Sequence, residues 1–281
     1  MPHRFLIFTD LDGTLLDHDT YSFEPALPAL RLLEKEKIPL IICTSKSRGE
    51  IERQRALLGN NHPFISENGG GIFIPEGYFA HEFTYDKKLN GYYVIEPGTP
   101  QETLRGVLKS VARETGIDIK GISDMSVSEI MESTGLNEES AVLAGERSYS
   151  EPFLIYGDEA GVETVGRKLR ERGYSHTRGS RFHHILGEND KGKAVEIVSS
   201  LYKTESGNLT TIGIGDSLND LPMLRAVDFP VLVRKKGGIY ESGFELENPV
   251  LADGEGPSGW NSAILKFFIN YEEKTATKNR N

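Results

Sequence analysis

Two aspartates near the start of the chain have the type and spacing to act together on one ligand. Residues 5–8 form a continuous apolar run, typical of a strand buried on both faces, and Asp10 and Asp12 follow it. If the backbone is still extended there, both carboxylates point the same way. Two negative charges at so short a distance repel each other unless a cation lies between them or one carboxyl keeps its proton. An acidic turn at a strand end is the alternative, and it accounts for Asp12 and Gly13 but not for Asp10.

A second acidic cluster follows another apolar run, residues 209–214. Asp216 and Asp220 are four residues apart, so they share one face if this turn begins a helix, with Asn219 beside them. Together with Asp10 and the carbonyl of Asp12, they would offer hard oxygen ligands suited to Mg²⁺. Taken alone, the cluster also fits an acidic helix N-terminus favoured by the helix dipole.

Two further segments have features of anion sites. Thr44 begins a hydroxyl-rich segment between an apolar run (38–43) and an expected helix (48–58). Such a segment can cap the helix and can also hold a phosphate on free backbone N–H groups, and capping alone is the simpler interpretation. Lys191 stands at the start of an expected helix, where the helix dipole disfavours a cation unless an anion is bound nearby. A solvated lysine is the commoner case.

The elements that must position these residues alternate between strand and helix, which predicts an α/β fold with a doubly wound parallel sheet. Residues 84–187 form a block with strands and helices of its own. We therefore expect a second α/β domain inserted between core segments 1–83 and 188–281. The expected strands lie at 63–66, 72–74, 92–95, 153–156 and 183–186, and the expected helices at 100–115, 126–134, 137–144 and 161–173.

Composition narrows the possible partners. The chain has 281 residues, a net charge of −10 and one cysteine, Cys43, which allows no internal disulfide and fits a reducing compartment. The negative charge argues against a nucleic-acid partner, which requires clustered Lys and Arg. No signal-peptide pattern or membrane-length apolar run is present, so we expect a cytoplasmic protein with no membrane partner.

The motifs DLDGTL, Thr44, Lys191 and GDSLND, in this order, resemble the four motifs of the haloacid dehalogenase superfamily of phosphohydrolases. The resemblance implies a Rossmann-like core, and the insertion looks like the α/β cap of the branch that acts on sugar phosphates. It also implies that Asp10 is the nucleophile and Asp12 the general acid and base. Thr44 and Lys191 would hold the phosphoryl oxygens, and Asp10, Asp12, Asp216 and Asp220 would hold Mg²⁺.

Five further segments resemble one family of that branch, the mannosyl-3-phosphoglycerate phosphatases. They are CTSKS (43–47), SENGG (66–70), RSYSEPF (147–153), RGSRFHH (178–184) and GPSGWNSAI (256–264). Ser180 and His183 depart from the family's pattern, which leaves the sugar open. The resemblance implies these substrate-binding residues: Ser45, Lys46, Glu67, Asn68, Gly69, Arg147, Ser150, Arg178, Gly179, Arg181, His184 and Asn219.

The resemblance implies a Mg²⁺-dependent phosphatase that converts a glycosyl-3-phosphoglycerate, above all mannosyl-3-phosphoglycerate, into the compatible solute mannosylglycerate and phosphate. Alternatives are a phosphatase of glucosyl-3-phosphoglycerate or another sugar phosphate, and a phosphosugar mutase. A module that binds sugar phosphates without catalysis is a third alternative. The intact motif residues argue against it, namely Asp10, Asp12, Lys191, Asp216 and Asp220. In each case the partner is a small phosphorylated molecule.

Overall fold

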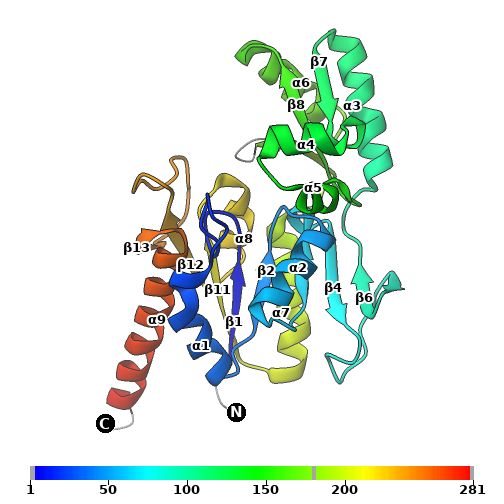
Figure 1. Ribbon diagram of the computed structural model, residues 1–281. Coiled ribbons are helices and arrows are strands. Elements are labelled where there is room, and N and C mark those ends of the chain that lie inside the picture. The colour runs from blue at the N-terminus through cyan, green and yellow to red at the C-terminus, as the bar shows by residue number, and fades with distance from the viewer. Residues whose placement is uncertain (1–3, 179–181, 279–281) are drawn as a thin grey trace. The chain divides into compact units, whose positions relative to one another are not determined.

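The computed structural model describes residues 4–178 and 182–278 (Figure 1). Two compact units divide the chain, one made of residues 1–42 and 199–281 and the other of residues 43–198. Among the described helices, none is long and apolar enough to cross a membrane.

A parallel sheet forms the centre of the first unit. Its strand order is β13-β12-β11-β1-β2, and every neighbouring pair is parallel. Leu6, Ile7 and Phe8 of β1 have no exposed surface, as expected for a strand buried on both faces. The predicted α/β class with a parallel core is therefore confirmed. The strands are β1 (Arg4–Thr9), β2 (Leu40–Cys43), β11 (Leu209–Gly215), β12 (Phe229–Arg234) and β13 (Val250–Glu255).

The last helix of this unit holds the end of β1 in place. Trp260 is completely buried, and its indole N–H donates to the hydroxyl of Thr9 (3.1 Å), which in turn donates to the carbonyl of Asp10 (2.7 Å). The segment around Trp260 was noted in the sequence only for its resemblance, and its helix was not predicted. The helices of the unit are η1 (Glu24–Ala26), α1 (Leu27–Lys35), η4 (Leu218–Asp220), α8 (Leu221–Arg225) and α9 (Gly256–Lys278).

The second unit contains an antiparallel sheet in the order β3-β4-β6-β5. The predicted hairpin is confirmed, with Phe64 opposite Phe73 and their rings stacked at 4.8 Å between centroids. The strands are β3 (Phe64–Ser66), β4 (Gly71–Pro75), β5 (Lys87–Leu89) and β6 (Tyr92–Ile95), and the neighbouring helices are α2 (Arg48–Leu58), η2 (Glu67–Gly69) and α7 (Lys191–Ser206).

A second antiparallel sheet of the same unit has the order β7-β8-β10-β9. Helices α3 and α6 pack on it through Leu104, Val165 and Phe153. The helices predicted here are confirmed to within two residues at each end, but the edge strands β7 and β9 were missed because they are short, polar and partly exposed. The elements are α3 (Gln101–Thr115), β7 (Asp118–Gly121), η3 (Ile122–Asp124), α4 (Val127–Thr134), α5 (Glu138–Gly145), β8 (Glu151–Tyr156), α6 (Glu159–Glu171), β9 (Ser175–Arg178) and β10 (His183–Leu186).

The boundaries expected for the inserted domain stay a prediction. The whole four-stranded sheet β7-β8-β10-β9 lies inside residues 84–187. Strands β5 and β6 lie in the same range of the sequence, but β6 pairs with β4, which precedes it.

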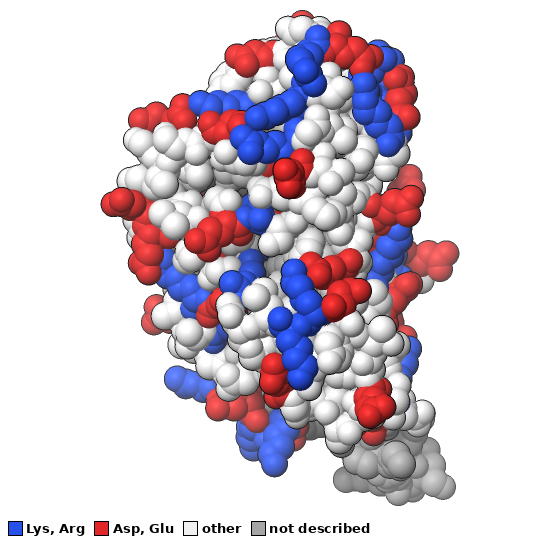
Figure 2. Space-filling view, turned by 90° about the vertical axis from the view of Figure 1, so that its right-hand side faces the viewer, with Lys and Arg blue, Asp and Glu red and all other residues white. Residues whose placement is uncertain are grey.

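Charged side chains of both signs are interspersed on the face shown in Figure 2. Within the second unit, ion pairs join different elements, such as Arg105 with Asp124 and Lys168 with Glu114 (2.8 Å). Both pairs are partly exposed, so solvent screens the two charges and each pair contributes little to stability.

Candidate active site

Three buried carboxylates gather at the carboxyl ends of β1 and β11. Asp10 follows β1 directly, and its N–H still donates to the carbonyl of Ile214 (3.0 Å). Asp216 follows β11 directly. Carboxylate oxygens of Asp10, Asp216 and Asp220 lie within 4.8 Å of one another, and each of these residues is at most 6% exposed. The structure thus brings the two acidic clusters of the sequence together.

Hydrogen bonds fix the second cluster. One oxygen of Asp220 accepts from the backbone N–H groups of Asp216 (3.1 Å) and Ser217 (3.0 Å). Asp216 in turn accepts from the hydroxyls of Thr14 (3.1 Å) and Ser217 (3.0 Å). Asp216 precedes the 3₁₀ turn η4 and Asp220 ends it. The two are therefore not neighbours along an α-helix, the arrangement that their spacing suggested.

Gly13 allows the two clusters to approach. Its φ of +77° is one that other residues rarely adopt, and a Cβ at this position would lie 3.0 Å from a carboxylate oxygen of Asp216. Asp12, on the other side of the motif, is half-buried and forms an isolated bridge with Leu16. The predicted role of Asp12 as acid and base stays a prediction.

The electrostatics of the acidic cluster favour a bound cation. Burial, together with the charges of Asp220 and Asp10, raises the pKa of Asp216 to about 7. Three carboxylates held this close repel each other unless a proton or a cation intervenes. Hard oxygen donors of this kind suit a divalent ion such as Mg²⁺. The residues present therefore fit a metal ion of that class.

The segment that begins at Thr44 caps helix α2. Thr44 is 1% exposed, and its N–H donates to the carbonyl of Ile65 (3.1 Å). The cap is Ser47, whose hydroxyl accepts from the N–H of Glu50, while the Ser47 N–H donates to the Glu50 carboxylate (2.9 Å). The capping interpretation of this segment is confirmed. Phosphate binding by Thr44 stays a prediction.

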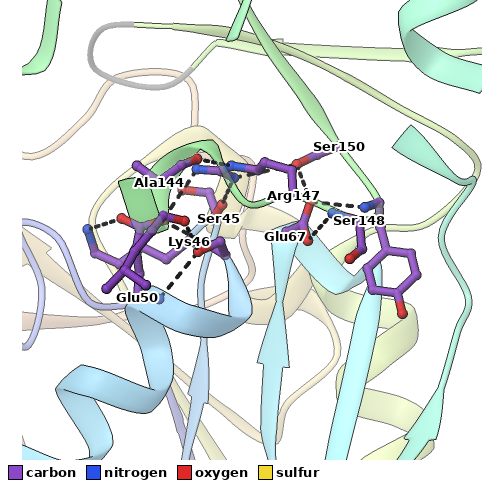
Figure 3. A network of polar contacts seen from close by, with 11 residues as sticks. Ser45, Lys46, Glu50, Glu67, Ala144, Arg147, Ser148 and Ser150 are labelled. Carbon is purple, nitrogen blue, oxygen red and sulfur yellow. Dashed lines mark hydrogen bonds and ion pairs between the residues drawn. The ribbon is translucent and has the colours of Figure 1, made fainter. Parts of the chain in front are cut away.

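Arg147 lies against the start of the same helix (Figure 3). Its guanidinium donates to the carbonyls of Ser45 (2.6 Å) and Ala144 (3.0 Å), and it pairs with Glu50 at 3.5 Å. Lys46 pairs with the other oxygen of Glu50 at 3.4 Å. Burial alone would raise the pKa of Glu50, but the charges of Lys46 and Arg147 and its hydrogen bonds lower it. Much of the hydrogen-bonding capacity of Arg147 is therefore used within the protein.

Glu67 is also engaged by the protein. Its carboxylate accepts from the N–H groups of Ser148 (2.9 Å) and Tyr149 (3.0 Å) and from the hydroxyl of Ser150 (2.7 Å). Glu67 and its neighbour Asn68 are 1% and 3% exposed. No pattern in the sequence indicates these contacts, because they join residues about eighty positions apart.

Lys191 and His184 are both buried. Lys191 has no exposed surface, which rules out the solvated lysine considered from the sequence. Burial lowers the pKa of His184 to about 3, helped by the charges of Arg147 and Lys191 among others. Its imidazole is therefore neutral near pH 7. Within the described residues, its Nδ1 and the hydroxyl of Thr177, opposite it on β9, are buried without a hydrogen-bond partner.

Thr177 did not stand out in the sequence, and only its position opposite His184 makes it a candidate for substrate contact. Arg178 is exposed at the end of β9. The predicted substrate contacts Gly179 and Arg181 lie outside the described residues.

Comparison with known proteins decides the family. A family model described as haloacid dehalogenase-like hydrolase matches residues 7–92. A glucosyl-3-phosphoglycerate/mannosyl-3-phosphoglycerate phosphatase of Methanococcoides burtonii is 47% identical, over 93% of this chain and 96% of its own length. A phosphatase of the same name from Persephonella marina is 40% identical, over 95% of this chain and 98% of its own. The chain belongs to the mannosyl-3-phosphoglycerate phosphatase family.

This phosphatase also shares its fold with solved structures. A Thermoplasma acidophilum protein gives a TM-score of 0.68 at 19% identity, covering 95% of this chain and 99% of the other. The sucrose-phosphatase of Synechocystis gives 0.64 at 14% identity, covering 95% and 98%. At such low identity these likenesses concern the fold alone, and they agree with the haloacid dehalogenase fold expected from the motifs.

Proposed function

We propose that the chain is a Mg²⁺-dependent phosphatase of mannosyl-3-phosphoglycerate that releases mannosylglycerate and phosphate. The observation that carries this proposal is the buried group Asp10, Asp216 and Asp220, in a chain 47% identical to a phosphatase named for this substrate. That relative's name also includes glucosyl-3-phosphoglycerate, which is therefore the second candidate substrate. One cysteine, Cys43, and a small polar substrate support a cytoplasmic location.

In the proposed reaction, a carboxylate oxygen of Asp10 attacks phosphorus and the P–O bond to the glycerate breaks. Asp12 gives its proton to the departing alkoxide. Asp12 then takes a proton from water, which attacks the aspartyl-phosphate and regenerates Asp10 with release of phosphate. Thr44 and Lys191 hold the phosphoryl oxygens, for which the buried ammonium of Lys191 supplies positive charge. Bound Mg²⁺, held by Asp10, Asp216, Asp220 and the carbonyl of Asp12, would supply charge neutralisation at this centre.

Specificity is proposed to depend on residues outside the acidic cluster. An arginine matches the planar glycerate carboxylate bidentately, which favours Arg178 and Arg181. His184 and Thr177 have buried polar atoms that suit sugar hydroxyls. Most polar groups of Arg147 and Glu67 are used within the protein, so these two predicted contacts have weaker support. The remaining candidates are Ser45, Lys46, Asn68, Gly69, Ser150, Gly179 and Asn219.

The proposal is tested by measuring phosphate release with Mg²⁺ from mannosyl-3-phosphoglycerate, glucosyl-3-phosphoglycerate, 3-phosphoglycerate and a hexose phosphate. We expect the highest kcat/KM for one of the two glycosyl-3-phosphoglycerates. A preference for the hexose phosphate would assign another sugar phosphatase. Isomerised sugar phosphate without net phosphate release, dependent on an added bisphosphate, would assign a mutase.

A further inference from the structure

The turn formed by residues 66–71 has an unusual backbone. Glu67, Asn68 and Gly69 have φ values of +50°, +54° and +89° in succession. Residues other than glycine adopt such angles rarely, and here two of them do so while almost completely buried. A strained conformation of this kind persists only where its surroundings impose it, and it is common at functional sites.

One side of this turn binds the loop of residues 147–150 (Figure 3). The three hydrogen bonds to the Glu67 carboxylate all come from this loop, and they stabilise a charge that is otherwise removed from water. The loop also packs directly on the turn. A Cβ on Gly70 would lie 2.3 Å from the Cβ of Tyr149, and one on Gly71 would lie 2.6 Å from its Cε2.

The other side of the turn contacts the segments that carry two proposed phosphoryl-binding residues. The N–H of Asn68 donates to the carbonyl of Thr44 (3.0 Å), and the N–H of Glu67 donates to the carbonyl of Lys46 (3.0 Å). A Cβ on Gly69 would lie 2.1 Å from the carbonyl oxygen of Asp190, the residue before Lys191. The turn is therefore packed between the 147–150 loop and the backbone beside Thr44 and Lys191.

We propose that Glu67 is a positioning residue. By binding the 147–150 loop, its carboxylate holds the strained turn in the one conformation that sets the backbone at Thr44 and Lys191. It acts through these residues and makes no contact with the substrate. The role in catalysis rests on the proposed function, whereas the structural link to the loop does not.

Glu67→Gln separates this role from general stability. The side chain keeps its shape, but an NH₂ group replaces one oxygen, so the N–H of either Ser148 or Tyr149 loses its acceptor in both amide orientations. Glu151→Gln is the matched control. Glu151 is also completely buried, and it accepts from the backbone N–H (3.0 Å) and hydroxyl of Ser123 and from the Gln101 amide (2.8 Å).

The experiment measures amide hydrogen exchange of the 147–150 loop together with kcat and KM on mannosyl-3-phosphoglycerate and on a small phosphate ester. In Glu67→Gln we expect exchange of the N–H of Ser148 or of Tyr149, whichever loses its acceptor, to quicken roughly tenfold or more, as for the loss of one hydrogen bond to a charged group. We expect kcat to fall by a similar factor on both substrates, because both use Thr44 and Lys191, with a smaller change in KM. Glu151→Gln should leave both kcat values within about twofold, even at equal loss of thermal stability.

Two outcomes would contradict the positioning role, and a third would contradict only the proposed substrate. A loss confined to the glycosyl substrate, with unchanged exchange, would make Glu67 a direct substrate contact. Equal losses of kcat in Glu67→Gln and Glu151→Gln would reduce Glu67 to a stabilising residue. If the wild-type enzyme cleaves the small ester but neither glycosyl-3-phosphoglycerate, the proposed substrate is wrong, and exchange with kcat on the ester still tests Glu67.

Discussion

Asp10, Asp216 and Asp220 are held together by backbone hydrogen bonds although burial and mutual repulsion both disfavour three negative charges at one place. In a residue selected for stability alone, either effect would favour an uncharged side chain. The three carboxylates are therefore best explained by a chemical function that outweighs their cost in stability. Substitutions of these residues can separate the two effects.

Asp10→Asn should abolish turnover while the protein stays folded. The amide has nearly the same volume, relieves repulsion and cannot act as the nucleophile. Phosphate release and thermal unfolding measured side by side check this. Activity above about one per cent of wild type would rule out covalent catalysis by Asp10.

Mg²⁺ should stabilise the wild-type protein independently of activity. A ligand that binds only the folded state adds about 2.7 kcal/mol at one hundred times its Kd, which raises the thermal midpoint. Asp216→Ala should lose this rise, and chelation should remove it from the wild type along with phosphatase activity.

Asp228→Asn is the control for that measurement. Asp228 accepts from the N–H and the hydroxyl of Thr211 (both 2.8 Å), so its substitution should lower stability but keep the response to Mg²⁺. If the midpoint of the wild type does not respond to Mg²⁺, the acidic cluster has a structural role.

At the scale of elements, glycines with positive φ serve two different purposes. Gly59 ends helix α2 with a φ of +63°, and a Cβ there would meet nothing within 4 Å. Gly69 combines a φ of +89° with the close carbonyl of Asp190. The first glycine supplies only a backbone conformation, whereas the second also supplies the space in which α7 begins.

Gly59→Ala and Gly69→Ala should therefore differ in free energy of unfolding. The first adds only left-handed strain, about 1–2 kcal/mol. The second adds a clash with backbone to that strain, so a larger loss of stability is expected, together with a loss of kcat. Denaturant unfolding of both variants measures the difference, and equal losses would mean that the turn can move away from Asp190 without harm.

At the scale of the whole molecule, burial lowers the pKa of four histidines among the described residues, which are His62, His176, His183 and His184. Burial lowers the pKa of both His62 and His176 to about 4, and that of His184 to about 3. In the unfolded chain each would titrate near 6.5. The unfolded state therefore takes up protons first as the solution is acidified.

Stability should consequently be fully present above about pH 6.5 and fall between that pH and about pH 4. Each histidine contributes a slope of up to about 1.4 kcal/mol per pH unit. Urea unfolding at pH 7, 6 and 5 measures it, and His62→Gln should reduce the slope, because glutamine does not titrate. The raised pKa of Asp216 acts in the opposite direction over the same range, so the test is the change in slope. An unchanged slope in His62→Gln would show that this side chain accepts a proton in the folded state.

The sequence by itself determined the class of the fold and the residues of the acidic cluster. A continuous apolar run such as residues 5–8 predicts a strand that is buried on both faces, in the middle of a sheet. The polar residues that follow the run directly mark the end of that strand, where the acidic cluster lies. The hairpin of β3 and β4 and the helices α3 to α6 follow from periodicity of the same kind.

Only the tertiary structure decided which polar side chains are buried or hydrogen-bonded within the protein. Lys191 is buried, Glu67 binds a loop about eighty residues away, and Trp260 donates to Thr9 across 251 positions of the chain. The type of a side chain determines which groups it can bind. It does not show whether a distant part of the chain already uses its hydrogen-bonding capacity. That use is set by packing between segments far apart in sequence, which periodicity and spacing do not record.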